Sequence, residues 1–104
     1  NKPNSTKQLP IENRPILYEE ISFKSSPNPF KESTQLNVTL PEASEVSIVL
    51  YNTLGQEVKT VLAPTSLEEG DYNYTLNGSD LPVGVYYATI RWNGGVQTVS
   101  VVKQ

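Results

Sequence analysis

The sequence of 104 residues contains no cysteine, no histidine and no methionine. Without cysteine the chain forms no disulfide, carries no thiolate nucleophile and lacks the usual ligands of a structural zinc site. Without histidine it also lacks the side chain most often used in general acid–base catalysis. These absences weigh against an enzyme, and we expect neither a catalytic residue nor a cofactor.

Charged residues are scarce as well. They make up 18% of the chain, against about 25% in an average soluble domain. The net charge is −3, and lysine and arginine form no cluster. Because nucleic-acid binders need a basic surface to neutralise phosphates, we expect no nucleic-acid partner.

Long hydrophobic runs are also missing. No apolar stretch approaches the roughly 20 residues of a transmembrane helix, so we expect no transmembrane segment. Asn1 to Pro15 lacks the apolar region of a secretory signal peptide, and the chain does not begin with methionine. We therefore expect a fragment or a processed piece of a longer protein, with any N-terminal export signal elsewhere.

The chain is long enough for one domain. Residues 1–15 hold three prolines, each of which fixes φ and removes a backbone donor, and they show no hydrophobic period. We interpret 1–15 as a linker. From Ile16 onward apolar and polar residues alternate, so the domain is predicted to cover residues 16–104.

This alternation recurs in short segments bounded by proline and glycine, the pattern of half-buried strands. The predicted strands are 16–24, 35–40, 45–52, 57–63, 70–76, 85–92 and 96–103. Such spacing without helical periodicity is typical of an immunoglobulin-like sandwich. The predicted fold class is therefore all-β, an Ig-like antiparallel sandwich of about seven strands. Its predicted core contains Leu36, Val38, Val46, Ile48, Leu50, Tyr86 and Ile90.

Three connections carry turn signals. Pro41–Ser44 is short enough to predict a hairpin between the strands that flank it. Asn52–Gly55 fits a type I turn, with Gly55 in the left-handed region and a bulge at the glycine. Asn93-Gly94 predicts a two-residue hairpin.

The last strand does not alternate cleanly. Val96 and Val102 fall on one face, whereas Val99 and Val101 fall on the other. A β-bulge inserts one residue and so switches the face of everything after it. We therefore predict a bulge near Thr98.

Two aromatic residues have structural interpretations. Phe30 is the one large apolar residue of the loop after the first strand, and we expect it to plug the end of the core. Tyr86 follows a turn at the start of a late strand. This is the position of a tyrosine corner, in which the hydroxyl bonds to the backbone upstream.

Other chemistry is weakly indicated. A catalytic carboxylate pair stays open because pairing is spatial, but small domains rarely have the cleft that it needs. Glu68-Glu69-Gly70-Asp71 is similar to a weak Ca²⁺ loop without the spacing of an EF-hand. Tyr51, Tyr87 and Trp92 suit either a sugar-stacking platform or core packing. We favour solvated turn charges, packed aromatics and no metal.

Three segments together go beyond a generic sandwich: SPNPF (26–30), VSIVLYNTLGQEV (46–58) and LPVGVYYATI (81–90), with a strand that runs on to Gln104. In this order they resemble the type A C-terminal sorting domain of type IX secretion cargo in the Bacteroidetes and relatives. The resemblance covers about residues 25–104. Many family members finish on two or more basic residues, whereas this chain ends Lys103-Gln104.

The resemblance implies a non-catalytic address, read by the export machinery in the periplasm, for an upstream cargo domain in the same chain. The implied partners are the translocon and a sortase-like peptidase, which cleaves the domain before the cargo is joined to an anionic lipopolysaccharide. The implied location is the periplasm in transit and then the cell surface or medium. The residues that carry the motifs are Pro27, Asn28, Pro29, Tyr51, Asn52, Gly55, Gln56, Leu81, Pro82, Gly84, Tyr86, Val101, Val102 and Lys103.

From the residues alone we expect the glycines to form turns and the prolines to interrupt an edge strand. We expect recognition to use exposed side chains and the final strand, with which a receptor could pair at a sheet edge. A second interpretation stays open. An accessory Ig-like module of an extracellular enzyme, which spaces domains or binds glycan, has a similar composition.

Overall fold

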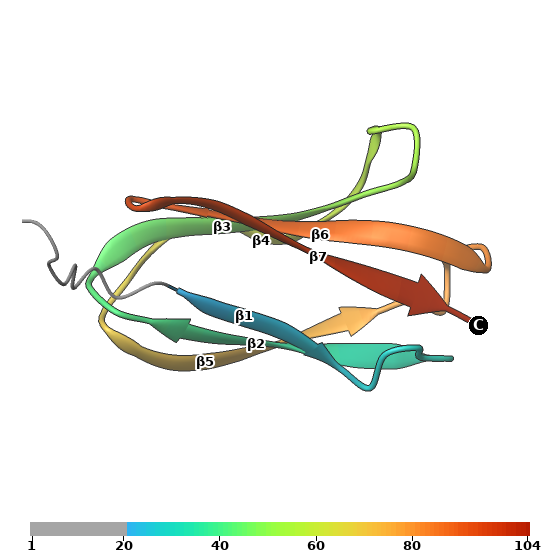
Figure 1. Ribbon diagram of the computed structural model, residues 1–104, viewed down its shortest axis with the longest axis horizontal. Helices are drawn as coiled ribbons and strands as arrows, with labels where there is room; N and C mark the ends of the chain where they lie inside the picture. The colour runs from blue at the N-terminus through green and yellow to red at the C-terminus, as the bar shows by residue number, and fades with distance from the viewer. Residues whose placement is uncertain (1–20) are drawn as a thin grey trace, which may run out of the picture.

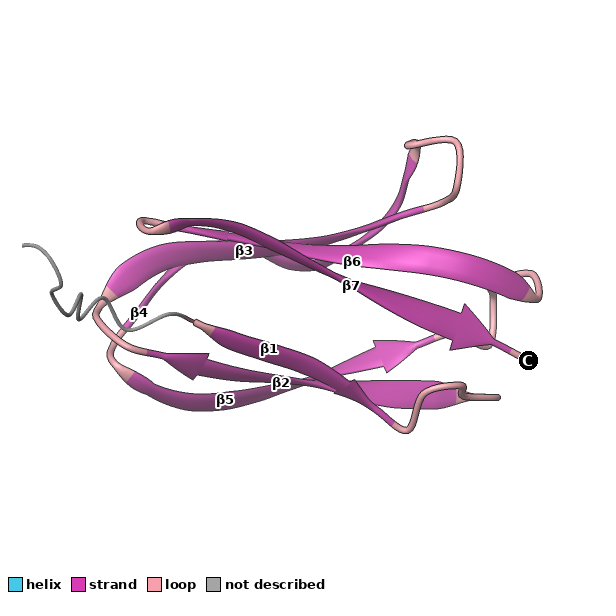
Figure 2. Cartoon of the chain, in the orientation of Figure 1, coloured by secondary structure: helices cyan, strands magenta, loops and turns pink. Residues whose placement is uncertain are grey.

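The computed structural model describes residues 21–104, which form two antiparallel sheets packed face to face (Figure 1). Every regular element of this range is a strand (Figure 2), so it holds no helix that could cross a membrane. One sheet has the order β1-β2-β5 and the other β4-β3-β6-β7. The strands are β1 (Ser22–Ser26), β2 (Ser33–Leu40), β3 (Ser44–Tyr51), β4 (Glu57–Leu67), β5 (Gly70–Asn77), β6 (Gly84–Trp92) and β7 (Gly95–Lys103).

This architecture confirms the predicted all-β, Ig-like antiparallel sandwich of seven strands. The first strand was expected at 16–24, and the structure has β1 at Ser22–Ser26. It ends directly before Pro27, because Pro27 and Pro29 have no N–H to continue a ladder. The predicted linker at 1–15 and the start of the first predicted strand lie outside the described residues.

The predicted hairpin between the second and third strands is wrong. β2 pairs with β1 and β5, whereas β3 pairs with β4 and β6. The short connection after β2 crosses from one sheet to the other, and buried Ser44 at its end accepts a hydrogen bond from the Asn93 N–H at 2.8 Å. A hairpin and a crossing produce the same alternation, because each strand must turn its apolar face to the core either way.

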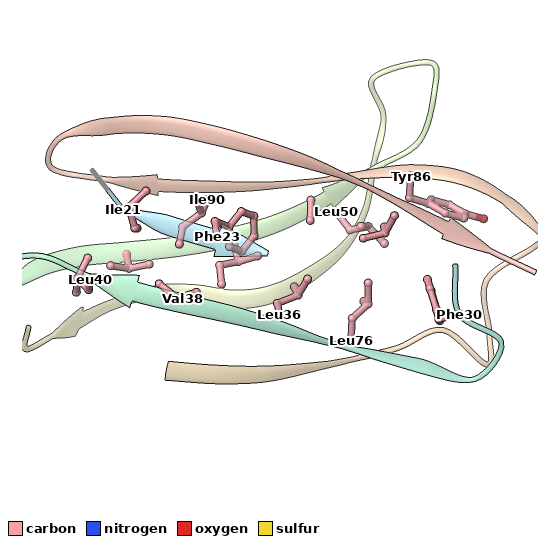
Figure 3. Close-up of a cluster of buried hydrophobic side chains, with 14 residues drawn as sticks. Ile21, Phe23, Phe30, Leu36, Val38, Leu40, Leu50, Leu76, Tyr86 and Ile90 are labelled. Carbon is pink, nitrogen blue, oxygen red and sulfur yellow. The ribbon is translucent and has the colours of Figure 1, made fainter. Parts of the chain in front are cut away.

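The core lies between the sheets and follows the alternation of the strands. Inward side chains of β2 face those of β3 and β6 across the layer, and Phe30 closes one end with 2% of its surface exposed (Figure 3). All seven residues predicted for the core are buried. The buried set is Ile21, Phe23, Phe30, Leu36, Val38, Leu40, Val46, Ile48, Leu50, Leu76, Tyr86, Ala88, Ile90 and Val101.

The predicted bulge near Thr98 is also wrong. β6 and β7 pair without a shift from Gly84↔Lys103 to Trp92↔Gly95. Val101 therefore points into the core, while Val102 points outward, opposite Val85. The register shifts lie instead in the β3–β4 pair. β7 keeps the same face toward the core along its whole length, and its outward face also carries valines, such as Val96 and Val102.

Replacement of Ile48 by alanine tests this core. Ile48 is fully buried in the middle of β3, so the change leaves a cavity that a close-packed interior fills only in part. We expect Ile48→Ala to lower the free energy of unfolding by about 2–5 kcal/mol, measured by urea denaturation. The matched control is Val96→Ala on β7, 57% exposed, which should change it by less than about 0.5 kcal/mol. Equal effects of the two changes would contradict the observed packing.

Candidate recognition surface

The residues that carry the three motifs gather at one end of the sandwich. There the β1–β2, β3–β4 and β5–β6 connections meet the end of β7, on the right of Figure 1. We call this region, made of residues 27–32, 52–56, 78–83 and 101–104, the motif end. The remaining motif residues, Tyr51, Gly84 and Tyr86, lie in the strand ends next to these loops.

The β3–β4 turn is organised by Asn52. Its side-chain oxygen accepts the N–H groups of Leu54 at 2.9 Å and Gln56 at 3.0 Å, and its amide donates to Gln56 Oε1 at 2.8 Å. The backbone adds Gly55 N–H to Asn52 O at 3.0 Å and Asn52 N–H to Gln56 O at 2.9 Å. Gly55 has φ of 81°, which confirms the predicted turn and its left-handed glycine. Asn52, Gly55 and Gln56 thus shape a rigid loop.

The start of β6 is fixed by Tyr86. Its ring is buried, and its hydroxyl donates to Pro82 O at 2.5 Å, which confirms the predicted tyrosine corner. Half-buried Leu81 packs against the core, and its N–H bonds to Gly78 O at 2.9 Å. The LPVG segment is therefore a tied loop that closes the end of the sandwich.

The SPNPF segment is attached to the edge of β7. Asn28 donates its amide to Ser100 O at 2.8 Å and accepts the Val102 N–H at 3.0 Å, as a neighbouring strand would. Two residues further on, Phe30 N–H bonds to Val102 O at 2.9 Å and Gln104 N–H bonds to Phe30 O at 2.8 Å. The edge of β7 from Ser100 to Gln104 is therefore occupied from within the domain.

Phe30 also explains a glycine that the motifs did not include. A Cβ at Gly78 would lie 2.6 Å from Phe30 Cε2, too close for any side chain. The Gly78 N–H in turn bonds to Glu32 O at 2.8 Å. Gly78 thus lets the β5–β6 connection lie directly on the ring that plugs the core.

Most motif residues are accounted for by these contacts. Val101 and Tyr86 lie in the core, while Pro27, Asn28, Pro29, Gln56 and Pro82 are exposed. The part that each plays in recognition stays a prediction. A partner of the folded domain can touch only the exposed and half-buried members, Lys103 among them.

The sequence reasoning missed a cluster of exposed apolar side chains. The motif end and the strand ends beside it carry five of the six large hydrophobic residues that are exposed among residues 21–104; the sixth, Val96, lies toward the opposite end. Clustered apolar exposure marks contact surfaces, whereas single exposed residues are ordinary. The alternation of β6 already placed Val85 and Tyr87 outside, which was the available signal. The five are Leu54, Val58, Val83, Val85 and Tyr87.

Comparison with known families decides between the interpretations. Residues 26–104 match the model of the secretion system C-terminal sorting domain. The chain belongs to this family. Its members are type IX secretion signals rather than catalytic domains, so the domain directs export toward the cell surface or the extracellular space. A search of curated proteins gave no match.

The three aromatic residues that the sequence suggested as a sugar-stacking platform lie on different sides of the four-stranded sheet in this sorting domain. Tyr51 and Tyr87 are direct neighbours on the outer face of the four-stranded sheet. Trp92 lies on the inner side of β6, where it packs against the core, and its ring covers Gly94 toward the opposite end. The three rings therefore do not form one flat surface for a sugar.

The acidic side chains of the sorting domain were also considered as a metal site. Among residues 21–104 no three acidic side chains come close enough to hold a metal ion. Within the segment similar to a Ca²⁺ loop, Asp71 accepts a hydrogen bond from Thr39 at 2.8 Å across the sheet. This side chain is thus engaged by a neighbouring strand.

One ion pair joins β4 to the β5–β6 connection. Lys59 Nζ donates to Asp80 Oδ1 at 2.9 Å and to Asn77 O at 2.8 Å. The hydrogen bond from Lys59 lowers the pKa of the Asp80 carboxyl. A lowered folded-state pKa means that the pair stabilises the domain above the unfolded-state pKa of about 4 and loses this effect as the pH falls through the lowered value. The carboxyl is exposed, so solvent screens the effect.

The turn at Gly55 gives a direct test of strain. A Cβ there would meet nothing within 4 Å, so a substitution changes only the backbone preference. We expect Gly55→Val to lower the free energy of unfolding by more than about 1 kcal/mol, because β-branched residues avoid positive φ. Gly55→Asn, which tolerates this region, should cost less. Urea denaturation of both variants measures the difference, and an equal loss would reject strain as the cause.

The attachment of SPNPF to β7 is tested by hydrogen exchange. Asn28→Ala removes the acceptor of the Val102 N–H, so this amide should exchange faster in NMR experiments. Asn73→Ala is the control, because it removes a side-chain hydrogen bond with Asn37 on the outer face of the other sheet. It should leave the Val102 rate unchanged. Protection of Val102 that survives Asn28→Ala would contradict the observed contact.

Proposed function

We propose that the type IX secretion machinery reads this folded domain at the motif end and carries an upstream cargo domain of the same chain across the outer membrane. A sortase-like peptidase then separates the domain from the cargo, which is attached to the surface or released. The domain itself performs no chemistry in this scheme. It provides a shape that the machinery recognises.

The observation that carries the proposal is the family match over residues 26–104, whose motifs fall at one end of the fold. This region and the strand ends beside it carry five of the six exposed large apolar side chains of residues 21–104. Motif loops and apolar exposure therefore coincide. A surface of this kind suits a protein partner, since apolar area is what an interface buries at its centre.

The β7 edge limits how a partner can bind. Strand addition needs free backbone N–H and C=O groups along an edge. From Ser100 to Gln104 these groups already bond to Asn28 and Phe30. A strand added there would first have to displace the SPNPF segment, so we favour recognition through loops and exposed side chains of the motif end.

Export of a reporter tests the proposal. The full chain is fused to the C-terminus of a periplasmic reporter in a bacterium with a type IX system, and the exported fraction is measured. The unchanged domain should carry the reporter to the surface or medium. Lys103→Glu, at the motif end, should lower that fraction while the free energy of unfolding changes by no more than about 1 kcal/mol. Lys24→Glu, exposed on β1, is the control and should have no effect.

Each contrary result has a defined meaning. Export that survives Lys103→Glu but fails after Ile48→Asp would show that the machinery reads the folded surface away from Lys103. A reporter that stays in the periplasm with the unchanged domain attached would defeat the sorting proposal. That result would favour an accessory module of an extracellular enzyme.

A further inference from the structure

The most exposed large apolar residue of the motif end lies in a turn that is held by several hydrogen bonds. Leu54 is 80% exposed at the tip of the β3–β4 hairpin, which projects beyond the body of the sandwich (Figure 1). Its own N–H is held by Asn52, whose side chain also bonds to Gln56. The hydrogen bonds of this turn therefore fix the backbone of a leucine that packs against nothing in the core cluster.

We propose that Leu54 is the anchor with which this domain enters an apolar pocket on a protein of the secretion machinery, and that Asn52 and Gln56 are positioning residues that present it. The inference rests on the proposed function and deepens it by naming the contact. A preordered turn loses little conformational freedom on binding, so the burial of its apolar tip contributes to affinity with small entropic loss. In many interfaces a few side chains that fill well-packed pockets carry most of the binding energy.

The charge of the hairpin favours a protein pocket over a lipid surface. From Tyr51 to Val58 the single charged residue is Glu57. Association with anionic membranes relies on lysine and arginine next to the apolar residue, and the nearest cation along the chain, Lys59, is already paired with Asp80. A convex tip of this size requires a concave site, and an apolar residue requires an apolar lining.

Two hollows on the described surface show what a second copy of this chain could offer such a tip. One hollow on the described surface is lined by polar side chains of β2, β5 and their neighbouring loops. Another, near the β6–β7 hairpin, has a mixed lining in which Glu45 and Arg91 accompany Val46, Pro64 and Trp92. The first hollow does not match an aliphatic side chain and the second matches it only in part, so we commit to a different protein as the partner and test a second copy by light scattering.

The test compares two exposed apolar positions in the reporter fusion. Leu54→Ser should reduce the exported fraction about tenfold or more, because burial of a leucine is worth roughly ten- to a hundredfold in affinity. Leu54→Met keeps an apolar tip and should retain most of the export. Val96→Ser, 57% exposed toward the opposite end, should export like the unchanged domain. Thermal unfolding of the free chain should be the same for all three variants.

The role of Asn52 is tested by a graded pair. Asn52→Ala removes all side-chain bonds of the turn, whereas Asn52→Asp keeps the oxygen that accepts the N–H groups of Leu54 and Gln56. Export should fall with alanine and recover substantially with aspartate. If Asn52 acted only through stability, export in the two variants would follow their melting temperatures, and that result would overturn its positioning role.

Further outcomes separate this inference from the proposed function. No export with the unchanged domain would defeat both. Normal export with Leu54→Ser, or an equal loss with Val96→Ser, would overturn the anchor while the sorting role stands. Two measurements on the purified chain exclude other occupants: light scattering, and sedimentation with phosphatidylcholine–phosphatidylglycerol vesicles. A dimer, or vesicle binding, that Leu54→Ser abolishes would overturn the protein pocket. A monomer that does not bind vesicles, combined with the export loss, would support it.

Discussion

The domain depends on the burial, between its two sheets, of the side chains that β2, β3 and β6 turn inward. Because side chains alternate along a strand, this burial also decides what faces outward. Leu50 and Tyr86 lie in the core, so their neighbours Tyr51 and Tyr87 must lie on the outer face, where they pair. The exposed apolar surface is thus a consequence of the same register that makes the core, and a change of register would bury it.

A second constraint acts at the edge of the four-stranded sheet. A strand such as β7 exposes unpaired backbone groups unless something covers them. Here Asn28 and Phe30 cover its last residues, and Phe30 also plugs the core against Gly78. The two prolines of SPNPF suit this task, because they end β1 and free the chain to cross to the other sheet. Edge protection and core closure are therefore combined in one short segment.

Local sequence signals correctly predicted the Gly55 turn and the Tyr86 corner, whereas the contacts between distant segments were not predicted. The hydrogen bonds of Gly55 and Tyr86 are made with residues no more than four positions away. The turn-forming residue types and their positions were therefore enough to predict both features. The contact of Asn28 with β7 spans more than 70 residues, and nothing in the sequence of either segment indicates it. The same limit explains the wrong hairpin after Leu40, because alternation specifies which face is buried but not which strand lies alongside. Trp92 was grouped with Tyr87 by type, although alternation places them on opposite faces.

Several residues of the motif segments serve mainly to shape the domain. Asn52 and Gly55 make the turn, Tyr86 ties the corner, and Asn28 holds the edge; each is explained by a contact within the domain. A change at any of them alters shape and recognition together, so loss of function there does not identify the contact surface. A change at an exposed residue that the motif presents, such as Leu54, alters the surface while the shape stays. Within the motif segments, the residues that form the shape are therefore distinct from exposed residues such as Leu54, which a partner can touch.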